Sequence, residues 1–461
     1  MWSVLRFTPF DTSTEEGRSK ERYRRVALST AASAAAKVIV VLTTLVTVPL
    51  TVGYLGAERY GLWMTISATI AMLGFGDLGI GLGLLNAVSE ADGRDDREAA
   101  IRYVSSGFYM LLAIGLFFIA VFTVAYPFIP WGRIFNVVTD LAARESGPAV
   151  TVFLGCFALN VPLWVVNRVH MGYQEGFINS LWEIFGNIIG LMGILLAIHV
   201  KAGLPWLVLA MSGPPALASL VNGVILFTVR RPWLIPKWEK ATRDAAAKIF
   251  RLGFLFFVLQ VTGAIAYSSD NIIAARILGV EAVTQYSIPM KLFSFIPLMM
   301  GMMLVPLWPA YGEAIARGDV GWVKSTLAKS VAISLLIAVP MSVLLVLLGR
   351  DILRLWVGPG IAPSIFFLLG FGVWTVMSST WGAVAMFLNG ANALRIQVVC
   401  TLFMCAGALI IKVFLARSIG LSGIIWGAVV AQSVFIVIPI TVYVRRLLSG
   451  MGRDALAVGT E

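Results

Sequence analysis

The sequence predicts an all-α polytopic membrane protein with about 12 transmembrane helices, arranged as two parallel six-helix lobes around a central cleft. First, 59% of the 461 residues are hydrophobic and only 13% are charged, whereas about 25% charged residues are usual in a soluble domain. Second, the apolar residues form runs of about 20 residues, the length that a helix needs to cross a hydrocarbon core roughly 30 Å thick. Third, a loop rich in Lys and Arg divides these runs into two similar sets.

The apolar runs can be placed along the chain as candidate helices. The first six cover residues 26–50, 61–86, 102–128, 148–168, 177–200 and 203–229. The second six cover residues 251–276, 283–308, 326–349, 361–388, 393–416 and 419–444. The sequence therefore predicts an N-terminal segment at 1–25, an N-lobe at 26–229, a basic inter-lobe loop at 230–250, a C-lobe at 251–445 and a tail at 446–461.

Lys and Arg are distributed unequally between the two sides of this arrangement. The N-terminus, the even-numbered loops and the tail contain about 24 of them, against about 9 in the odd-numbered loops. Because cytoplasmic loops hold the excess of positive charge, both termini are expected in the cytoplasm. The same bias accounts for the net charge of +11, so it predicts membrane lipids with anionic headgroups as partners and no nucleic acid.

The two halves share residues at an offset of 223 positions. Leu55, Gly56 and Glu58 recur as Leu278, Gly279 and Glu281, and the match continues without a gap from Leu84, Ala87, Glu90 and Ala91 to Leu307, Ala310, Glu313 and Ala314. Six helices in each half give both halves the same orientation in the membrane, so we expect an axis along the membrane normal to relate them. Such repeats usually enclose a cleft.

Lys37 is the most informative single residue, because it lies near the centre of the first apolar run. A cation at this depth costs about 2.5 to 3.5 kcal/mol unless it faces water or a partner. Its repeat equivalent is Gln260, so both lobes place a hydrogen-bonding side chain at similar depth. This favours a shared wet cavity in which Lys37 meets an anionic group. The alternative is a structural ion pair with Asp77 or Asp270.

Other polar residues also fall inside apolar runs. Lys291 lies about a third of the way along the eighth run, where it could line the cavity or extend its ammonium group to the membrane interface. Glu183 lies in the fifth run with Asn187 one helical turn later. Glu183 could pair with a cation in the cavity, transfer a proton, or make a local structural hydrogen bond.

Gly74-Phe75-Gly76-Asp77-Leu78-Gly79 matches the GxGxxG pattern of dinucleotide-binding proteins. The segment lies within an apolar helix and follows no strand, so we reject that interpretation. With Gly81 and Gly83, it instead predicts close helix packing and an unwound turn that could offer backbone groups to a ligand.

Patterns typical of enzymes and metal sites are missing from the sequence. It contains no Walker loop, HExxH, GxSxG or Cys-x-x-Cys, and only two histidines. Cys156, Cys400 and Cys405 all lie in apolar runs, which favours buried packing over a disulfide or metal site. The sequence therefore predicts no enzyme, no cofactor and no metal ion.

Three segments resemble a known family. They are Tyr54-Leu55-Gly56-Ala57-Glu58-Arg59-Tyr60-Gly61-Leu62-Trp63, then Asp77-Leu78-Gly79, and finally Asp270-Asn271 through Leu278-Gly279 to Tyr286-Ser287. Together with the pattern of apolar runs, these segments resemble Wzx-type polysaccharide (O-antigen or exopolysaccharide) flippases of the multidrug/oligosaccharidyl-lipid/polysaccharide exporter superfamily. The resemblance covers nearly the whole chain except residues 1–20. Lipid II flippases of that superfamily typically have two further C-terminal helices, which this sequence lacks.

The resemblance implies a flippase in the bacterial inner membrane. Its substrate would be a lipid-linked (polyprenyl-pyrophosphate) oligosaccharide, moved from the cytoplasmic to the periplasmic leaflet by alternating access for surface polysaccharide biosynthesis. Partners would include a polysaccharide polymerase and glycosyltransferases. We hypothesise that Lys37, Lys291 and Gln260 bind the headgroup and pyrophosphate. The polar cavity or coupling residues would be Glu183, Asn187, Asp77, Asp270 and Asn271.

Two other functions fit the same fold class. A cation-coupled multidrug extruder of the same superfamily would need acidic cavity residues, whereas the first helix offers Lys37 and no carboxylate. A cationic cavity repels cationic drugs. A non-transporting scaffold for a glycan assembly complex would leave glycan export intact when Lys37 is neutralised.

Overall fold

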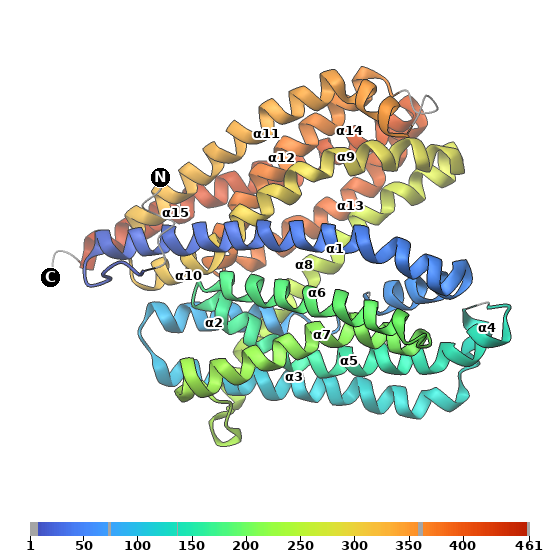
Figure 1. Cartoon of the computed structure of the whole chain (residues 1–461). Coiled ribbons are helices and arrows are strands. Elements are labelled where there is room, and N and C mark those ends of the chain that lie inside the picture. The colour runs from blue at the N-terminus through green and yellow to red at the C-terminus, as the bar shows by residue number, and fades with distance from the viewer. Residues whose placement is uncertain (1–7, 72–74, 136, 358–362, 459–461) are drawn as a thin grey trace. The chain divides into compact units, whose positions relative to one another are not determined.

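The computed structural model describes residues 8–71, 75–135, 137–357 and 363–458, and all regular secondary structure in these ranges is helical (Figure 1). The chain divides into two compact units, Met1–Phe254 and Leu255–Glu461. Among the described residues, eleven helices are long and apolar enough to cross a membrane. These helices confirm the predicted all-α membrane fold class.

Among the described residues, seven α-helices precede the inter-lobe loop. They are α1 (Glu15–Ala71), α2 (Ile80–Gly93), α3 (Arg97–Ala125), α4 (Trp131–Ile134), α5 (Asp140–Gly172), α6 (Gly176–His199) and α7 (Leu204–Ile225). A π-helical turn at Leu226–Arg230 and short 3-10 turns at Pro232–Leu234 and Trp238–Lys240 follow. The helix α8 (Arg243–Leu278) begins in the first unit and ends in the second.

In the described part of the second unit, seven further α-helices follow. They are α9 (Val280–Leu304), α10 (Leu307–Ala316), α11 (Val320–Val357), α12 (Ile365–Gly390), α13 (Leu394–Ile419), α14 (Leu421–Gln432) and α15 (Ile438–Val458). A π-helical segment, Ser433–Val437, joins α14 to α15.

The twelve predicted runs correspond to eleven spans because the second run is not one helix. α1 continues past the first run, changes direction at Gly56 and ends at Ala71. The remainder of the second run contains turns and α2, which has 14 residues. A helix of that length is shorter than the roughly 20 residues needed to cross the hydrocarbon core. Residues 72–74 lie outside the described residues.

The internal repeat is visible in the backbone. Gly56 has φ 74° and ψ 168°, and its equivalent Gly279 has φ 96° and ψ 165°. Only glycine adopts these angles readily, because a side chain would clash with the backbone. The repeated Leu-Gly pair therefore sets the same change of direction in both units.

A second contact is repeated in the two units. In each unit a short helix, α2 or α10, packs against a long helix, α5 or α12. A methyl group at Gly172 would lie 2.7 Å from the side chain of Val88, and one at Gly390 would lie 2.7 Å from Tyr311. Val88 and Tyr311 are separated by the same offset of 223 residues. Each unit thus uses a glycine at the end of a long helix, α5 or α12, to admit the equivalent short helix.

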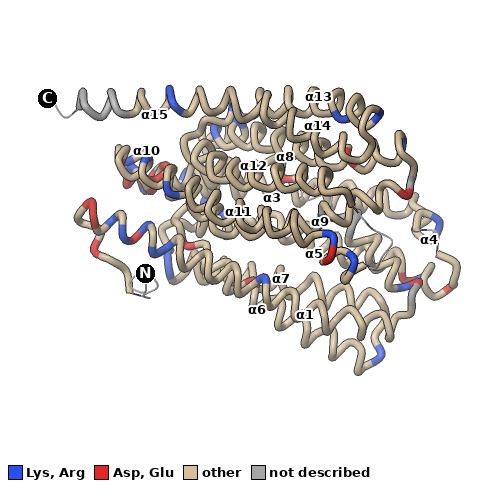
Figure 2. Tube along the Cα trace, turned by 90° about the horizontal axis from the view of Figure 1, so that it is seen from above, with Lys and Arg blue, Asp and Glu red and all other residues tan. Residues whose placement is uncertain are grey.

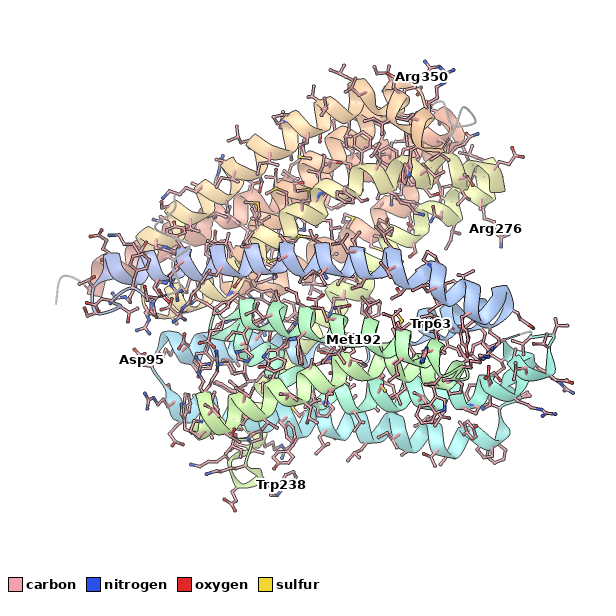
Figure 3. The ribbon with its side chains drawn as sticks, in the orientation of Figure 1. Trp63, Asp95, Met192, Trp238, Arg276 and Arg350 are labelled. Atoms are coloured by element: carbon pink, nitrogen blue, oxygen red, sulfur yellow. The ribbon has the colours of Figure 1, made fainter. Side chains whose placement is uncertain are left out.

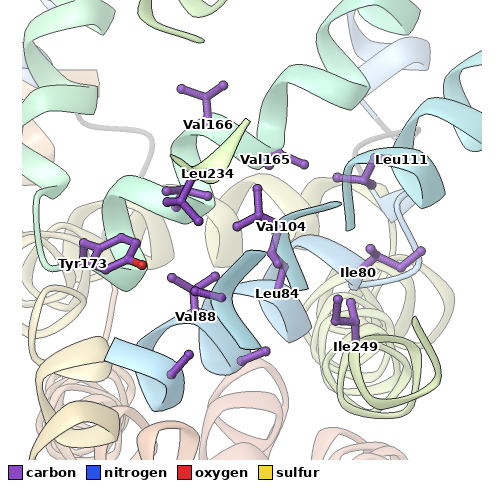
Figure 4. Close-up of a cluster of buried hydrophobic side chains, with 14 of the residues drawn as sticks. Ile80, Leu84, Val88, Val104, Leu111, Val165, Val166, Tyr173, Leu234 and Ile249 are labelled. Carbon is purple, nitrogen blue, oxygen red and sulfur yellow. The ribbon is translucent and has the colours of Figure 1, made fainter. Parts of the chain in front are cut away.

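The core of the first unit is a cluster of buried aliphatic side chains from α2, α3 and α5 (Figure 4). It includes Ile80, Leu84, Val88, Val104, Leu111 and Val165, and the α8 residue Ile249 packs against them. Because lipid tails are as apolar as this core, burial alone gives little preference for helix association, and close van der Waals packing supplies most of it.

Glycines make that close packing possible between α2 and the first part of α8. A methyl group at Gly83 would lie 2.3 Å from the backbone oxygen of Ile249, and one at Gly253 would lie 2.8 Å from the backbone of Gly79. The predicted packing role of the glycine-rich run is therefore seen at Gly79 and Gly83.

The substitution Gly83→Ala should lower the stability of the protein. The new methyl group meets backbone rather than a flexible side chain, so we expect a cost of about 1–3 kcal/mol, the usual range for overpacking. Thermal unfolding in detergent, with Gly155→Ala as the control, measures this. Gly155 has no neighbouring atom within 4 Å of the new methyl group. Equal Tm values for the two variants would contradict the packing role of Gly83.

Candidate functional site

Charged residues are concentrated toward the helix ends, and the middle portions of the helices contain few of them (Figure 2). The exceptions include Lys37 and Glu183 in the first unit and Asp270, Lys291 and Lys412 in the second, all of which lie within candidate membrane spans. A charge inside a span needs a partner or access to water. These residues are therefore the first candidates for a functional site.

Lys37 on α1 forms an ion pair with Glu183 on α6. Its Nζ atom donates to Oε1 of Glu183 at 3.2 Å, and the two side chains are 52% and 41% exposed. The partner is neither Asp77 nor Asp270, the two carboxylates considered from the sequence. Because both side chains are half exposed, the pair lies at the surface of its unit rather than in its core.

Polar contacts between α1 and α6 lead to this ion pair at successive helical turns. The backbone N–H of Phe177 donates to Oγ of Ser29 at 3.1 Å, and the hydroxyls of Ser33 and Ser180 lie 3.1 Å apart. Ser29, Ser33 and Lys37 are spaced four residues apart, so they share one face of α1. We call Ser29, Ser33, Lys37, Ser180 and Glu183 the polar seam.

The polar seam begins at the N-terminal end of α6, which the charge bias predicts to be cytoplasmic, and ends near the middle of the first span. Beyond Lys37 most exposed side chains of α1 are apolar, with Val41 57% and Leu45 66% exposed, and the hydroxyl of the exposed Thr44 donates to the backbone oxygen of Val40 at 2.7 Å. Asn187 does not add a contact to the polar seam, because its side-chain amide donates to the backbone oxygen of Glu183 at 2.8 Å.

A different charge network lies in the core of the second unit. Lys412 on α13 donates to Oδ1 of Asp270 at 2.5 Å and to the backbone oxygen of Ala266 at 3.1 Å. The hydroxyl of Tyr286 on α9 donates to Oδ2 of Asp270 at 2.8 Å. The side chains of Lys412 and Asp270 are only 4% and 7% exposed. This network fastens α8, α9 and α13 together.

The sequence did not predict Lys412 as a site residue, because it lies only four residues before the predicted end of its apolar run at residue 416. The helix continues to Ile419, so the ammonium group is deeper in the span than the run suggested. Asp270 gave the signal that could have found it, since a buried carboxylate in a membrane requires a cation.

Three of the predicted site residues join neither network. Gln260 makes only a long contact, 3.5 Å from its Nε2 to the backbone oxygen of Phe256. Lys291 on α9 and Asn271 on α8 are exposed at the surface of their unit. The structure thus brings Lys37 and Glu183 together and leaves these three residues as separate polar groups.

Asp77 caps the helix α2 at the break in the second run. Its carboxylate oxygens accept hydrogen bonds from the N–H groups of Gly79 at 2.8 Å and Gly81 at 3.1 Å. Leu78 and Gly79 have φ values of 51° and 74°. The predicted unwound turn is therefore present at these residues, but Asp77 takes two of the backbone N–H groups that a ligand could otherwise bind.

Residues 54–63, the first segment that carries the family resemblance, connect helices of the first unit at the end opposite to the inter-lobe loop. Glu58 accepts from the Thr139 hydroxyl at 2.6 Å at the start of α5. Arg59 forms two hydrogen bonds with Glu145, at 2.7 and 2.9 Å, and Glu145 accepts from the backbone N–H of Leu204 at 3.1 Å. This part of the segment thus stabilises the fold and does not form a binding site by itself.

At the opposite end of the same helices, Glu175 lies in a second cluster. Arg231 donates to both of its carboxylate oxygens, at 2.8 and 2.9 Å, and Nδ1 of His170 lies 3.3 Å away. The Arg231 guanidinium lies 4.0 Å above the ring of Tyr173. Burial alone would raise the pKa of Glu175, but the hydrogen bonds from His170 and Arg231 outweigh it and lower the pKa to about 2.

The contributions of Lys412 and Asp270 to stability should be coupled in a double-mutant cycle. Lys412→Met or Asp270→Asn alone leaves a buried charge without its partner, so each should cost about 3–5 kcal/mol. The double variant should cost clearly less than the sum. Thermal unfolding in detergent measures all three variants. Lys20→Met is the control, because its ion pair with Glu16 is exposed. Additive losses would show that the two side chains act independently.

The substitution Glu175→Gln should lower the free energy of unfolding at neutral pH, and it should lower it less in acid. The folded-state pKa of about 2 lies below the unfolded value, so this carboxylate contributes stability that is present above about pH 4.3 and is lost as the pH falls toward 2. We expect a deficit on the order of 3 kcal/mol at pH 7. Unfolding curves measured between pH 7 and pH 3 test this, and a deficit that does not change with pH would refute it.

Comparison with known proteins places the chain in a family. The sequence model of the polysaccharide biosynthesis protein family matches residues 26–315. A protein of Salmonella typhimurium named "Putative O-antigen transporter" is 21% identical over 423 residues, which cover 89% of this chain and 94% of that protein.

Solved structures of transporters share the fold. A MATE transporter in the bent conformation has a TM-score of 0.81 at 16% identity and covers 95% of this chain and 98% of its own. An outward-facing MATE transporter gives 0.75 at 15% identity, with coverages of 93% and 96%. A MOP superfamily transporter from Pyrococcus furiosus gives 0.74 at 17% identity, with coverages of 93% and 96%. These comparisons confirm the predicted fold class, and because the family model matches more than half of the sequence, the chain belongs to the polysaccharide biosynthesis protein family.

Proposed function

We propose that the protein is a flippase that moves a polyprenyl-pyrophosphate-linked oligosaccharide from the cytoplasmic to the periplasmic leaflet for surface polysaccharide biosynthesis. Membership of the polysaccharide biosynthesis family and similarity to an O-antigen transporter support a glycan as cargo. The fold shared with MATE transporters supports transport by alternating access. Glycosyltransferases would act before this step, and a polysaccharide polymerase would act after it.

The observation that supports this function best is the half-exposed Lys37–Glu183 pair at the inner end of the polar seam. A sugar and phosphate headgroup cannot be transferred through hydrocarbon without hydrogen-bonding partners. Lys37 and Glu183 are the accessible part of the polar seam, whereas Ser29 and Ser180 are only 3% and 6% exposed and join α1 to α6. The apolar surface of α1 beyond Lys37 suits contact with acyl and polyprenyl chains instead.

In this proposal the pyrophosphate of the substrate replaces Glu183 as the ionic partner of Lys37. A pyrophosphate diester has about two negative charges against one on the carboxylate, so it attracts the Lys37 ammonium more strongly at equal distance. A half-exposed ion pair contributes only about 0–1 kcal/mol, so little stability is lost when it opens. Lys291, Gln260 and Asn271 remain candidate polar residues of the second unit. Asp77 and Asp270 hold helices in this proposal, since both are already engaged within their own units.

A cation-coupled multidrug extruder is the second candidate. The MATE fold supports it, and the structure adds an exposed carboxylate, Glu183, that the first helix itself does not provide. Lys37 beside this carboxylate neutralises it, however, and so weakens the attraction for a cationic drug. This contact favours the anionic lipid-linked substrate.

Complementation of a deletion strain tests the proposal. The deletion should abolish surface polysaccharide and accumulate cytoplasmic-facing lipid-linked repeat units. Wild type and Lys37→Arg should restore export, whereas Lys37→Ala should slow it about tenfold to hundredfold, because a charge-assisted hydrogen bond worth about 1.5–3 kcal/mol is lost. Lys201→Ala, which changes an exposed lysine distant in sequence from the polar seam, is the control at matched membrane abundance.

Each outcome separates the candidates. Normal polysaccharide in the deletion strain, in the absence of a second exporter, would exclude the flippase and favour the drug extruder. Full rescue by Lys37→Ala would remove Lys37 from the substrate site. Glu183→Gln should retain export if the carboxylate only competes with substrate for Lys37, and it should abolish drug efflux if the carboxylate couples a cation to transport.

A further inference from the structure

Residues 231–242, between α7 and α8, form an ordered loop that is fastened to the first unit. Leu234 is fully buried. The backbone N–H groups of Lys237 and Thr242 donate to the hydroxyls of Ser105 and Ser106 on α3, each at 3.1 Å. With the ion pair between Arg231 and Glu175, these bonds fix the loop at both ends and in the middle. We call residues 231–242 the interfacial loop.

The interfacial loop presents a tryptophan to its surroundings although its backbone is fixed. Trp238 is 72% exposed and Ile235 is 42% exposed. The indole ring forms a T-shaped pair with the ring of Tyr109 on α3, with the ring centres 4.9 Å apart. Figure 3 shows Trp238 at the tip of the loop, which projects sideways from the helices of the first unit. An ordered loop that holds a large apolar ring outward indicates an apolar or mixed environment on that side.

Cations flank Trp238 in the sequence. Residues 230–251 contain seven Lys or Arg residues against two acidic residues, Glu239 and Asp244. Arg230, Lys237 and Arg243 are exposed, and within the described parts of the chain no carboxylate forms an ion pair with any of these three. The surface next to Trp238 is therefore strongly positive.

The depth of the interfacial loop follows from its neighbours. One candidate span ends at Arg230 and the next begins at Arg243. The apolar run before the loop ends at residue 229, so the loop begins at the edge of the hydrocarbon. Tryptophan is enriched at this level because its ring has an apolar body and one polar N–H group. A Lys or Arg near an anionic membrane surface contributes about 1 kcal/mol.

We infer that the interfacial loop is a binding site for anionic phospholipid headgroups, with Trp238 inserted at the headgroup level and Arg230, Lys237 and Arg243 contacting phosphates. Trp238 projects away from the helices of the first unit (Figure 3), so the inference places its ring over the lipid beside that unit. A lipid surface fits better than a protein partner because the cations lie on both sides of an exposed ring at headgroup depth. The site does not depend on the transported substrate.

Lipid retention tests the charged part of the site. The full-length protein is reconstituted with equal amounts of phosphatidylglycerol and phosphatidylcholine, extracted mildly, and the retained lipids are counted by native mass spectrometry. The triple variant Arg230→Gln/Lys237→Gln/Arg243→Gln should retain at least twofold less phosphatidylglycerol than wild type. The control is Arg133→Gln/Arg144→Gln/Lys201→Gln, which removes three exposed cations at the other end of the same helices. Equal retention by the two triple variants would overturn the inference.

Fluorescence tests the position of the ring. The difference between the spectra of wild type and Trp238→Phe isolates the emission of Trp238 among the 14 tryptophans. In nanodiscs, lipids brominated near the headgroup end of the acyl chains should quench this emission. Emission that is unaffected by brominated lipid would place the ring in water or against a protein, and the site would then be rejected. Both measurements are independent of flipping, so failure of the proposed function leaves them interpretable.

Discussion

A charge inside a hydrocarbon layer has to be paired, hydrogen-bonded or exposed to water, and this constraint determines how the charged residues of both units are arranged. Asp77 is held by backbone N–H groups at the start of α2. Asp270 is neutralised by Lys412. Lys37 is paired with Glu183 but remains accessible. Each solution has a different consequence: the first fixes a helix break, the second fastens three helices, and the third leaves a cation that a ligand can reach.

The contrast between the two ion pairs suggests a division of roles within the chain. The Lys412–Asp270 pair is almost fully buried, and Tyr286 satisfies the second carboxylate oxygen, so opening it would expose charges to apolar side chains. The Lys37–Glu183 pair is half exposed, so either side chain can exchange its partner for water or for an anion. Glu58, Arg59 and Asp270, which lie in the segments that carry the family resemblance, hold helices of their own units together.

Much of the fold could be predicted from the sequence, because apolar length and glycine positions act locally. The apolar runs anticipated most helices, and the repeat paired Gly56 with Gly279 without predicting that the backbone bends at both. The glycine-rich segment predicted an unwound turn in the second run, but not that the run divides into the end of α1 and a short helix α2 capped by Asp77. The partner of Lys37 was also missed. Glu183 was recognised, but its pairing depends on how α1 packs against α6, which residue patterns do not encode.

The near neutrality of the Lys37–Glu183 pair affects how the membrane potential would act on the proposed cycle. A group that moves across the field does work in proportion to its net charge, about 2.3 kcal/mol per charge for each 100 mV. The empty pair has a net charge of zero, so its return would be insensitive to voltage. With a pyrophosphate bound, the same region has a net negative charge, and an inside-negative potential drives it outward. The pairing of one lysine with one glutamate would thus make the voltage act on the loaded protein and not on the empty one.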